Sequence, residues 1–214
     1  MKKRIAKALS DRIEEEFISK YQRMKLSNER KKLCLPLISY LSETIQSGEQ
    51  GNLLFVCTHN SRRSQMAQFW AHYLSDYYSL PISVHSGGTE VTSCATQTIE
   101  AIQSMGIQIE NVTEDLNNPK YVLKSYLQFS ELTLYSKLYS TISQKADHFA
   151  CVMCCAQAEE SCPVIPGSVL KVALNYADPK ASDGTVREKV TYDECLRSIG
   201  ADIFYLFNEV KKRL

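Results

Sequence analysis

The stretch FVCTHNSRRSQM, residues 55–66, decides the fold of this chain. Its apolar start predicts a strand that ends at Cys57, and its last residues predict a helix from Ser64 to about Tyr78. The loop between them contains no apolar residue. A strand that leads through a short polar loop into a helix is the unit of a wound α/β sheet, in which ligands bind beyond the carboxyl ends of the strands. We therefore expect Cys57 at a ligand-binding edge.

The rest of the chain alternates between strand and helix patterns. Further strands are expected in ISVHS (82–86) and in the apolar run HFACVMC (148–154), and further helices over 93–106 and from about Thr191 to Lys212. An added pair of strands is expected in YVLKSYLQF (121–129) and LTLYS (132–136). This order predicts an α/β fold with a doubly wound, mostly parallel sheet.

Residues 1–48 are expected to form a helical extension in front of a catalytic domain of residues 52–214. Apolar residues recur every four positions from Leu33 to Ile45, while Pro36 suggests a kink or a restart of the helix. Residues 1–32 carry eleven Lys/Arg against five Asp/Glu. This surplus is typical of a solvated helical face, and since no nucleic-acid motif accompanies it, we expect no nucleic-acid partner.

Composition favours a protein of the cytoplasm. No apolar run in the 214 residues is long enough to cross a bilayer, and the basic start lacks the apolar core of a signal peptide. We therefore expect a cytoplasmic location and no membrane partner. Because the cytosol keeps thiols reduced, the eight cysteines are expected to serve chemistry or packing instead of a disulfide framework.

The loop after Cys57 has the composition of an oxyanion cradle. Backbone N–H groups and the start of a helix attract an anion, and the planar fork of Arg63 fits two of its oxygens. The same field stabilises a thiolate at Cys57, to which Ser64 can donate a hydrogen bond. The remaining loop residues expected to bind the anion are Thr58, His59, Asn60, Ser61 and Arg62. The alternative is a buried cysteine at the end of a strand, followed by two surface arginines.

Within this loop, two residues carry specific expectations. Asn60 is expected to lock the loop through its backbone. Arg62 is expected to face solvent, away from the centre of the loop.

The loop resembles that of the low-molecular-weight protein tyrosine phosphatase superfamily, Cys-x-Gly-Asn-x-x-Arg-Ser. Cys57, Asn60, Arg63 and Ser64 match this pattern, whereas His59 replaces the glycine. If that position requires a positive φ, a histidine adopts it only at a cost. The resemblance extends from about residue 52 to 207 and implies the phosphatase fold.

The resemblance also supplies a general acid. The pair Asp178-Pro179 corresponds to the Asp-Pro of the superfamily, whose aspartate protonates the leaving oxygen. On its own, an Asp-Pro pair is simply a turn.

Two cysteines indicate one branch of the superfamily. Cys155 and Cys162 lie seven positions apart, and Pro163 follows the second, as in the branch that reduces arsenate with thioredoxin. This resemblance implies that Cys57, Cys155 and Cys162 pass a disulfide from one to the next, and that thioredoxin removes it. Tyrosine phosphatases usually place two tyrosines after Asp-Pro, where this chain has Lys180-Ala181.

Several alternatives stay open. The chain could instead hydrolyse phosphotyrosine or small phosphate esters, or act as an oxyanion or redox sensor through its basic N-terminal helices. Cys154 could replace Cys155 as the resolving thiol, although the spacing favours Cys155. No bound metal or cofactor is expected, since the cysteines lack the paired Cys-x2-Cys spacing of structural zinc sites. Some members of the reductase branch bind potassium beside the loop, but Gln68 stands where a glutamate is expected.

Overall fold

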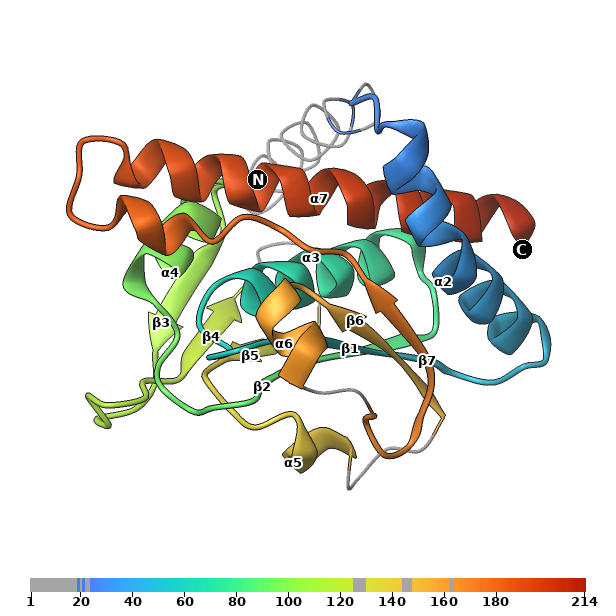
Figure 1. Cartoon of the computed structure of the whole chain (residues 1–214), viewed down its shortest axis with the longest axis horizontal. Helices are drawn as coiled ribbons and strands as arrows, with labels where there is room; N and C mark the ends of the chain where they lie inside the picture. Colours follow the sequence, from blue (N-terminus) through green and yellow to red (C-terminus); the bar gives the residue numbers. More distant parts are fainter. Residues whose placement is uncertain (1–18, 20, 22–23, 125–129, 144–147, 162–163) are drawn as a thin grey trace, which may run out of the picture.

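The computed structural model of the chain describes residues 19, 21, 24–124, 130–143, 148–161 and 164–214. Its centre is a four-stranded sheet in the order β2-β1-β6-β7, and all neighbouring strands are parallel (Figure 1). The strands are β1 (Gly51–Cys57), β2 (Ile82–Gly88), β6 (Phe149–Met153) and β7 (Ser168–Ala173). The predicted α/β fold with a mostly parallel sheet is confirmed.

Strand β1 lies inside the sheet, paired with β2 on one side and with β6 on the other. Its apolar residues are buried, as expected for a parallel strand covered on both faces. Cys57 pairs with Gly88, and Val56 pairs with Met153. The segments that follow β1, β2 and β6 therefore leave the sheet at the same edge.

Three long helices cover one face of the sheet, as Figure 1 shows. They are α2 (Asn28–Gln46), α3 (Arg63–Tyr78) and α7 (Glu188–Arg213). The predicted helix after the polar loop is thus confirmed, and the last helix begins earlier than predicted. Gly200 of α7 lies against the Trp70 ring of α3, and the Trp70 indole donates to the Leu196 carbonyl at 2.8 Å. This contact fixes α3, and with it the end of the polar loop, against the C-terminal helix.

The other helices that the structure describes in full are short. They are α4 (Thr96–Gln103), α5 (Ser140–Ser143), α6 (Ala156–Ser161) and the 3-10 helix η1 (Pro179–Ser182). Helix α4 follows Ala95, later than the start predicted at residue 93, and the chain turns after it at Gly106 with φ +84°.

A second sheet contains the antiparallel strands β3 (Gln108–Asn111), β4 (Tyr121–Lys124) and β5 (Leu132–Leu134). The predicted pair of added strands is confirmed in β4 and β5, and residues 125–129 of that prediction lie outside the described part of the chain. Strand β3 was not predicted, because its side chains are mostly exposed and show no alternation.

The described part of the N-terminal region packs on the core. Helix α2 runs through Pro36 without the restart that this proline suggested, and Cys34, Leu37, Ile38 and Leu41 are fully buried. The division of the chain at residue 48 stays a prediction, and most of residues 1–27 lie outside the described part. Among the described helices, none is long and apolar enough to cross a membrane.

Candidate active site

The loop from Cys57 to Ser64, here called the anion loop, joins β1 to α3 at the carboxyl edge of the sheet. Cys57 is buried, and its Sγ lies 3.0 Å from Ser64 Oγ. Asn60 Nδ2 donates to the same Ser64 oxygen at 2.8 Å. Because Ser64 Oγ accepts from Asn60, its own proton is free to point at the Cys57 sulfur.

The backbone of the anion loop is strained at Asn60 and not at His59. Asn60 has φ +46°, whereas His59 is absent from the described residues with positive φ, so the cost expected at His59 does not arise. Asparagine is among the residues that tolerate this conformation best. The His59 ring instead lies 3.4 Å from Glu90 at the surface.

Backbone N–H groups of neighbouring segments donate to the carbonyl groups of other loop residues. The Thr58 carbonyl accepts from the Glu90 N–H at 2.9 Å, and the Ser61 carbonyl accepts from the Ala95 N–H at 3.1 Å. Gly88 lies so close that a Cβ there would be 2.7 Å from Thr58 O and 2.8 Å from Asn60 N. The loop is therefore held from the end of β2 to the start of α4.

Two arginines flank the predicted general acid. Arg63 Nη2 donates to Asp178 Oδ2 at 2.8 Å, and its Nη1 donates to the Tyr176 carbonyl at 3.2 Å. Arg62 Nη1 lies 3.9 Å from Asp178 Oδ1. Asp178 also caps η1 by accepting from the Lys180 N–H. The structure thus brings Asp178 to the anion loop, although more than a hundred residues separate it from Cys57 in the sequence.

The expectation that Arg62 faces solvent is wrong. Its side chain is only 12% exposed, because Arg62 Nε donates to the hydroxyl of Tyr192 at 2.9 Å. That hydroxyl in turn donates to Asp183 at 2.8 Å. Burial raises the pKa of Tyr192, so the hydroxyl stays protonated and keeps both contacts. Sequence patterns gave no signal for this contact, because α7 reaches the loop only in the folded chain.

Cys155 lies beside the anion loop. It follows β6, the parallel neighbour of β1, and its buried Sγ is 3.6 Å from Thr58 Oγ1. The Ala158 N–H of α6 donates to this sulfur at 3.4 Å. The structure therefore brings Cys57 and Cys155 to one edge, whereas Cys162 lies outside the described residues.

The neighbouring Cys154 differs from Cys155 in its surroundings. It is fully buried, and burial, followed by the nearby Cys57 and Cys155, raises the pKa of its thiol well above the usual value. A thiol held protonated is a poor nucleophile, which favours Cys155 over Cys154 as the resolving thiol.

The other described cysteines lie in the packed interior. Burial raises the pKa of each of three thiols to about 12, namely Cys34, Cys94 and Cys195. Cys151 packs with its sulfur 3.5 Å from that of Met153. The described residues contain no group of three or more His, Cys, Asp or Glu side chains that could hold a metal ion. The expectation that no metal or cofactor is bound stays a prediction.

Comparison with known proteins identifies the family. A model of the low molecular weight phosphotyrosine protein phosphatase family matches residues 52–123. An arsenate reductase of Bacillus subtilis is 30% identical over 146 residues, which cover 68% of this chain and 86% of the relative. The chain belongs to the low molecular weight phosphatase family.

Two further relatives agree with this assignment. An arsenate reductase 2 of Staphylococcus haemolyticus is 31% identical over 132 residues, covering 61% of this chain and 80% of that protein. The solved structure of a low molecular weight protein tyrosine phosphatase from Bacillus subtilis superposes with a TM-score of 0.52 at 16% identity, covering 75% of this chain and 97% of that one. At this identity the superposition supports the fold alone.

Sequence reasoning missed residues 135–139, a segment that supports the anion loop. Ser136 Oγ donates to the His59 carbonyl at 2.8 Å, and the Lys137 N–H donates to Asn60 Oδ1 at 3.0 Å. The Tyr135 carbonyl accepts from Gln65 of α3 at 2.7 Å. No sequence signal could have placed this segment, because it lies after the added strands and only the fold brings it under the loop.

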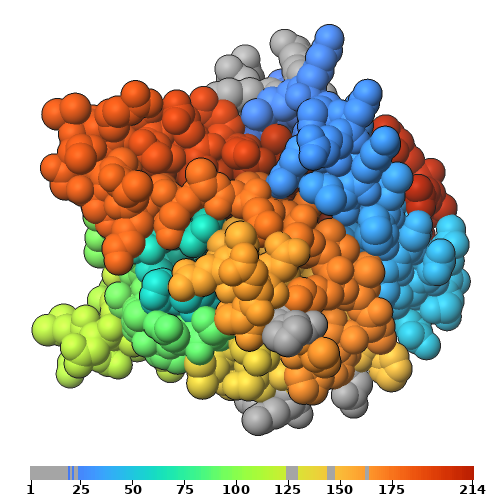
Figure 2. Space-filling model, viewed as in Figure 1, coloured from blue at the N-terminus to red at the C-terminus, as the bar shows by residue number. Residues whose placement is uncertain are grey.

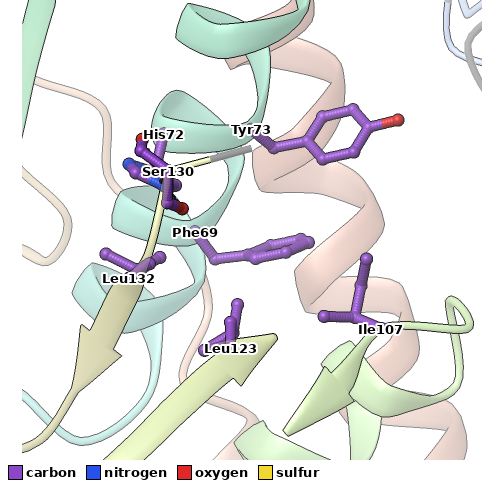
Figure 3. Close-up of a pocket in the computed structure, with 7 residues that line it drawn as sticks. All are labelled: Phe69, His72, Tyr73, Ile107, Leu123, Ser130 and Leu132. Carbon is purple, nitrogen blue, oxygen red and sulfur yellow. Dashed lines mark hydrogen bonds between the residues drawn. The ribbon is translucent and has the colours of Figure 1, made fainter. Parts of the chain in front are cut away.

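Other segments of the chain surround the surface near the anion loop. Figure 2 shows a small teal area, the colour of residues near the start of α3, between orange segments and the green segment that follows β2. A separate small pocket lies between α3 and the second sheet, lined by Phe69, His72, Tyr73, Ile107, Leu123, Ser130 and Leu132 (Figure 3). Its lining is almost entirely apolar and contains no thiol, so we do not connect it with oxyanion chemistry.

Proposed function

We propose that this protein reduces arsenate to arsenite, with Cys57 as the nucleophile and thioredoxin as the electron donor. The observation that carries the proposal is a second buried thiol beside the anion loop, Cys155, at 3.6 Å from the Thr58 hydroxyl. A phosphatase needs only the first thiol. Relatives named arsenate reductase support this choice.

In the first step, arsenate binds to the N–H groups of the loop and to Arg63. Arg63 Nε is buried and has no hydrogen-bond partner among the described residues, so this donor is available to the anion. The Cys57 thiolate attacks arsenic and forms a sulfur–arsenic bond. An arsenic–oxygen bond breaks, and Asp178 protonates the departing oxygen, which leaves as water.

In the second step, the Cys155 thiolate attacks Cys57 Sγ. The electron pair of the sulfur–arsenic bond passes to arsenic. The arsenic therefore leaves as arsenite, and a Cys57–Cys155 disulfide remains. Cys162 then attacks Cys155 Sγ and releases the Cys57 thiolate. The dithiol of thioredoxin reduces the resulting Cys155–Cys162 disulfide. This cycle requires a reducing compartment, so a cytoplasmic location is part of the proposal.

Hydrolysis of phosphate esters is the second candidate. The match of residues 52–123 to the phosphatase family and the approach of Asp178 to the loop favour it. Cys57 would then form a phosphocysteine that water hydrolyses. Lys180 and Ala181 are exposed where tyrosine phosphatases usually hold the substrate ring between tyrosines, and this argues against phosphotyrosine.

The test counts arsenite released per chain. With thioredoxin, thioredoxin reductase and NADPH, the native protein should turn over repeatedly, as should the control Cys34→Ala, whose thiol lies in α2. Cys162→Ser should release one arsenite and stop at the Cys57–Cys155 disulfide. Cys155→Ser should release none, because the arsenic adduct cannot be resolved.

One result would make the protein a phosphatase. The native chain would release no arsenite but would hydrolyse an aryl phosphate, and both serine variants would retain that hydrolysis.

A further inference from the structure

Lys137 places a buried ammonium group under the anion loop. The residue is only 8% exposed, and its Nζ donates to Ser86 Oγ of β2 and to the Tyr135 carbonyl, both at 3.3 Å. The ammonium also lies 4.6 Å from the centre of the Tyr135 ring. No carboxylate of the described residues lies within 4.0 Å of it. Within the described part of the chain, the group is hydrogen-bonded but has no ionic partner.

Such a group opposes folding, since a buried charge without a counter-ion is unfavourable. Burial lowers the pKa of Lys137 to about 8, which leaves the side chain mostly charged at pH 7. Among the described residues, the titratable groups that interact with it, Cys94 and His85, supply no negative charge at that pH. Burial raises the pKa of the Cys94 thiol to about 12 and lowers that of His85.

The position of Lys137 suggests why the charge is kept. Its backbone N–H donates to Asn60, which in turn donates to Ser64, the hydrogen-bond partner of Cys57. Its ammonium binds Ser86, two residues before Gly88, which pairs with Cys57. Ideal strand spacings put the Cα atoms of Ser86 and Cys57 about 8 Å apart. The ammonium is thus held on the strand that pairs with that of Cys57, and a buried region between such strands screens a charge far less than water does.

We propose that Lys137 is a positioning residue whose buried ammonium is a fixed countercharge for the Cys57 thiolate and for the oxyanion bound above it. The inference rests on oxyanion binding by the loop, but not on whether arsenate reduction or ester hydrolysis follows. It explains a buried cation for which the described residues provide no ionic partner, because its partner is the charge that the site acquires during catalysis.

The test compares Lys137→Met and Lys137→Gln with a matched control. Lys120→Met removes an exposed ammonium that also lies over the Tyr135 ring, at 5.2 Å. Inorganic phosphate is the probe, with its dissociation constant measured by calorimetry. The rate of Cys57 alkylation by iodoacetamide, followed by mass spectrometry across pH 5–10, reports the thiolate.

Both Lys137 variants should fold and melt no lower than the native protein. Both should bind phosphate about tenfold more weakly, and Cys57 alkylation should shift by about one pH unit to higher pH. Lys120→Met should match the native protein in both measurements. A merely structural lysine would not move the alkylation profile in a variant that is folded and stable.

Three results would overturn the proposal. In the first, Lys137→Met binds phosphate and reacts as the native protein does. In the second, Lys137→Gln alone regains native behaviour, which would assign the effect to hydrogen bonding and not to charge. In the third, Lys137→Met fails to fold, which would show that the ammonium stabilises the core. A native protein that binds neither phosphate nor arsenate would instead defeat the proposed function itself.

Discussion

The anion loop and the segment from Cys154 to Ser161 leave neighbouring strands at the same edge, yet they are held very differently. The loop is fixed by backbone hydrogen bonds from the end of β2, from the start of α4 and from residues 135–139. The other segment contains one short helix, α6, and among the described residues its backbone bonds to neighbouring segments are confined to Cys154. Side chains hold the rest: Thr58 contacts Cys155 and donates to Gln157 at 3.1 Å, and Lys171 and Asn175 donate to Glu159. A helix of this length has little stability of its own.

This difference matches the tasks proposed for the two segments. Oxyanion binding gains from groups held in place before the anion arrives. Disulfide transfer needs two sulfurs to approach to about 2 Å, so the segment that carries Cys155 has to shift. The chain thus combines a binding loop held by backbone hydrogen bonds with a thiol segment held mainly by side-chain contacts, and the predictions below test this contrast.

The largest effect is expected from Cys57→Ser. Arsenite formation should fall by at least about 10³-fold, because the nucleophile is lost. Phosphate binding measured by calorimetry should persist, since the N–H groups and Arg63 hold the anion without the thiol. Loss of binding together with turnover would mean that the loop depends on Cys57 for its shape.

The next largest effect is expected from Gly88→Ala. The added Cβ would lie 2.7 Å from the Thr58 carbonyl, so the loop has to move. We expect a loss of about 1–3 kcal/mol in the free energy of unfolding, measured in urea, and weaker phosphate binding. The matched change Ala156→Ser, at an exposed position of α6, should be tolerated. Equal losses of stability and of phosphate affinity from both changes would contradict the contrast between the two segments.

Lys137→Met should change stability in a pH-dependent way. The unfolded chain holds this proton up to the ordinary lysine pKa of 10.5, whereas the folded chain loses it at about 8. Between these values the unfolded state binds more protons, so native stability rises with pH. The variant lacks this buried charge. Its free energy of unfolding should therefore exceed that of the native protein most below pH 8, on the order of 1–3 kcal/mol, and should equal it above about pH 10.5. Urea unfolding at pH 7 and pH 9.5 measures the difference, and an equal gain at both values would contradict it.

The smallest effect is expected from Tyr192→Phe. The change removes the hydroxyl that accepts from Arg62 and donates to Asp183. Because Arg62 also lies near Asp178, we expect turnover to fall about threefold to tenfold, equivalent to about 1 kcal/mol. Phosphate affinity should change less than turnover. A variant with native turnover would show that Arg62 needs no anchor.

The sequence predicted the part of the site that is local in the chain. A strand, a polar loop and a helix follow one another over residues 51–78, so periodicity and the loop residues were enough to place Cys57, Arg63 and Ser64. The matching pair Asp178-Pro179 could be interpreted only through the family resemblance. The structure then brought Asp178 to Arg63.

The parts that were missed depend on contacts between distant segments. Strand β7 at the edge of the sheet has exposed side chains that break the apolar pattern. Residues 135–139 carry no motif, although they support His59 and Asn60. Arg62 seemed to face solvent because nothing in the sequence links it to Tyr192. When a helix that is distant in the sequence buries one end of a polar side chain, no periodic pattern in the sequence predicts it.

The pairing of Arg63 with Asp178 has a consequence for selectivity. In the folded chain the Asp178 carboxylate already accepts a hydrogen bond from the Arg63 guanidinium, so it competes with any anion from solution for this arginine. A weakly held anion such as chloride would not displace it, whereas a tetrahedral dianion with several acceptor oxygens could. Displacement frees the guanidinium for the anion and releases Asp178 from Arg63. The ion pair would thus select for anions that bind the arginine better than a carboxylate does.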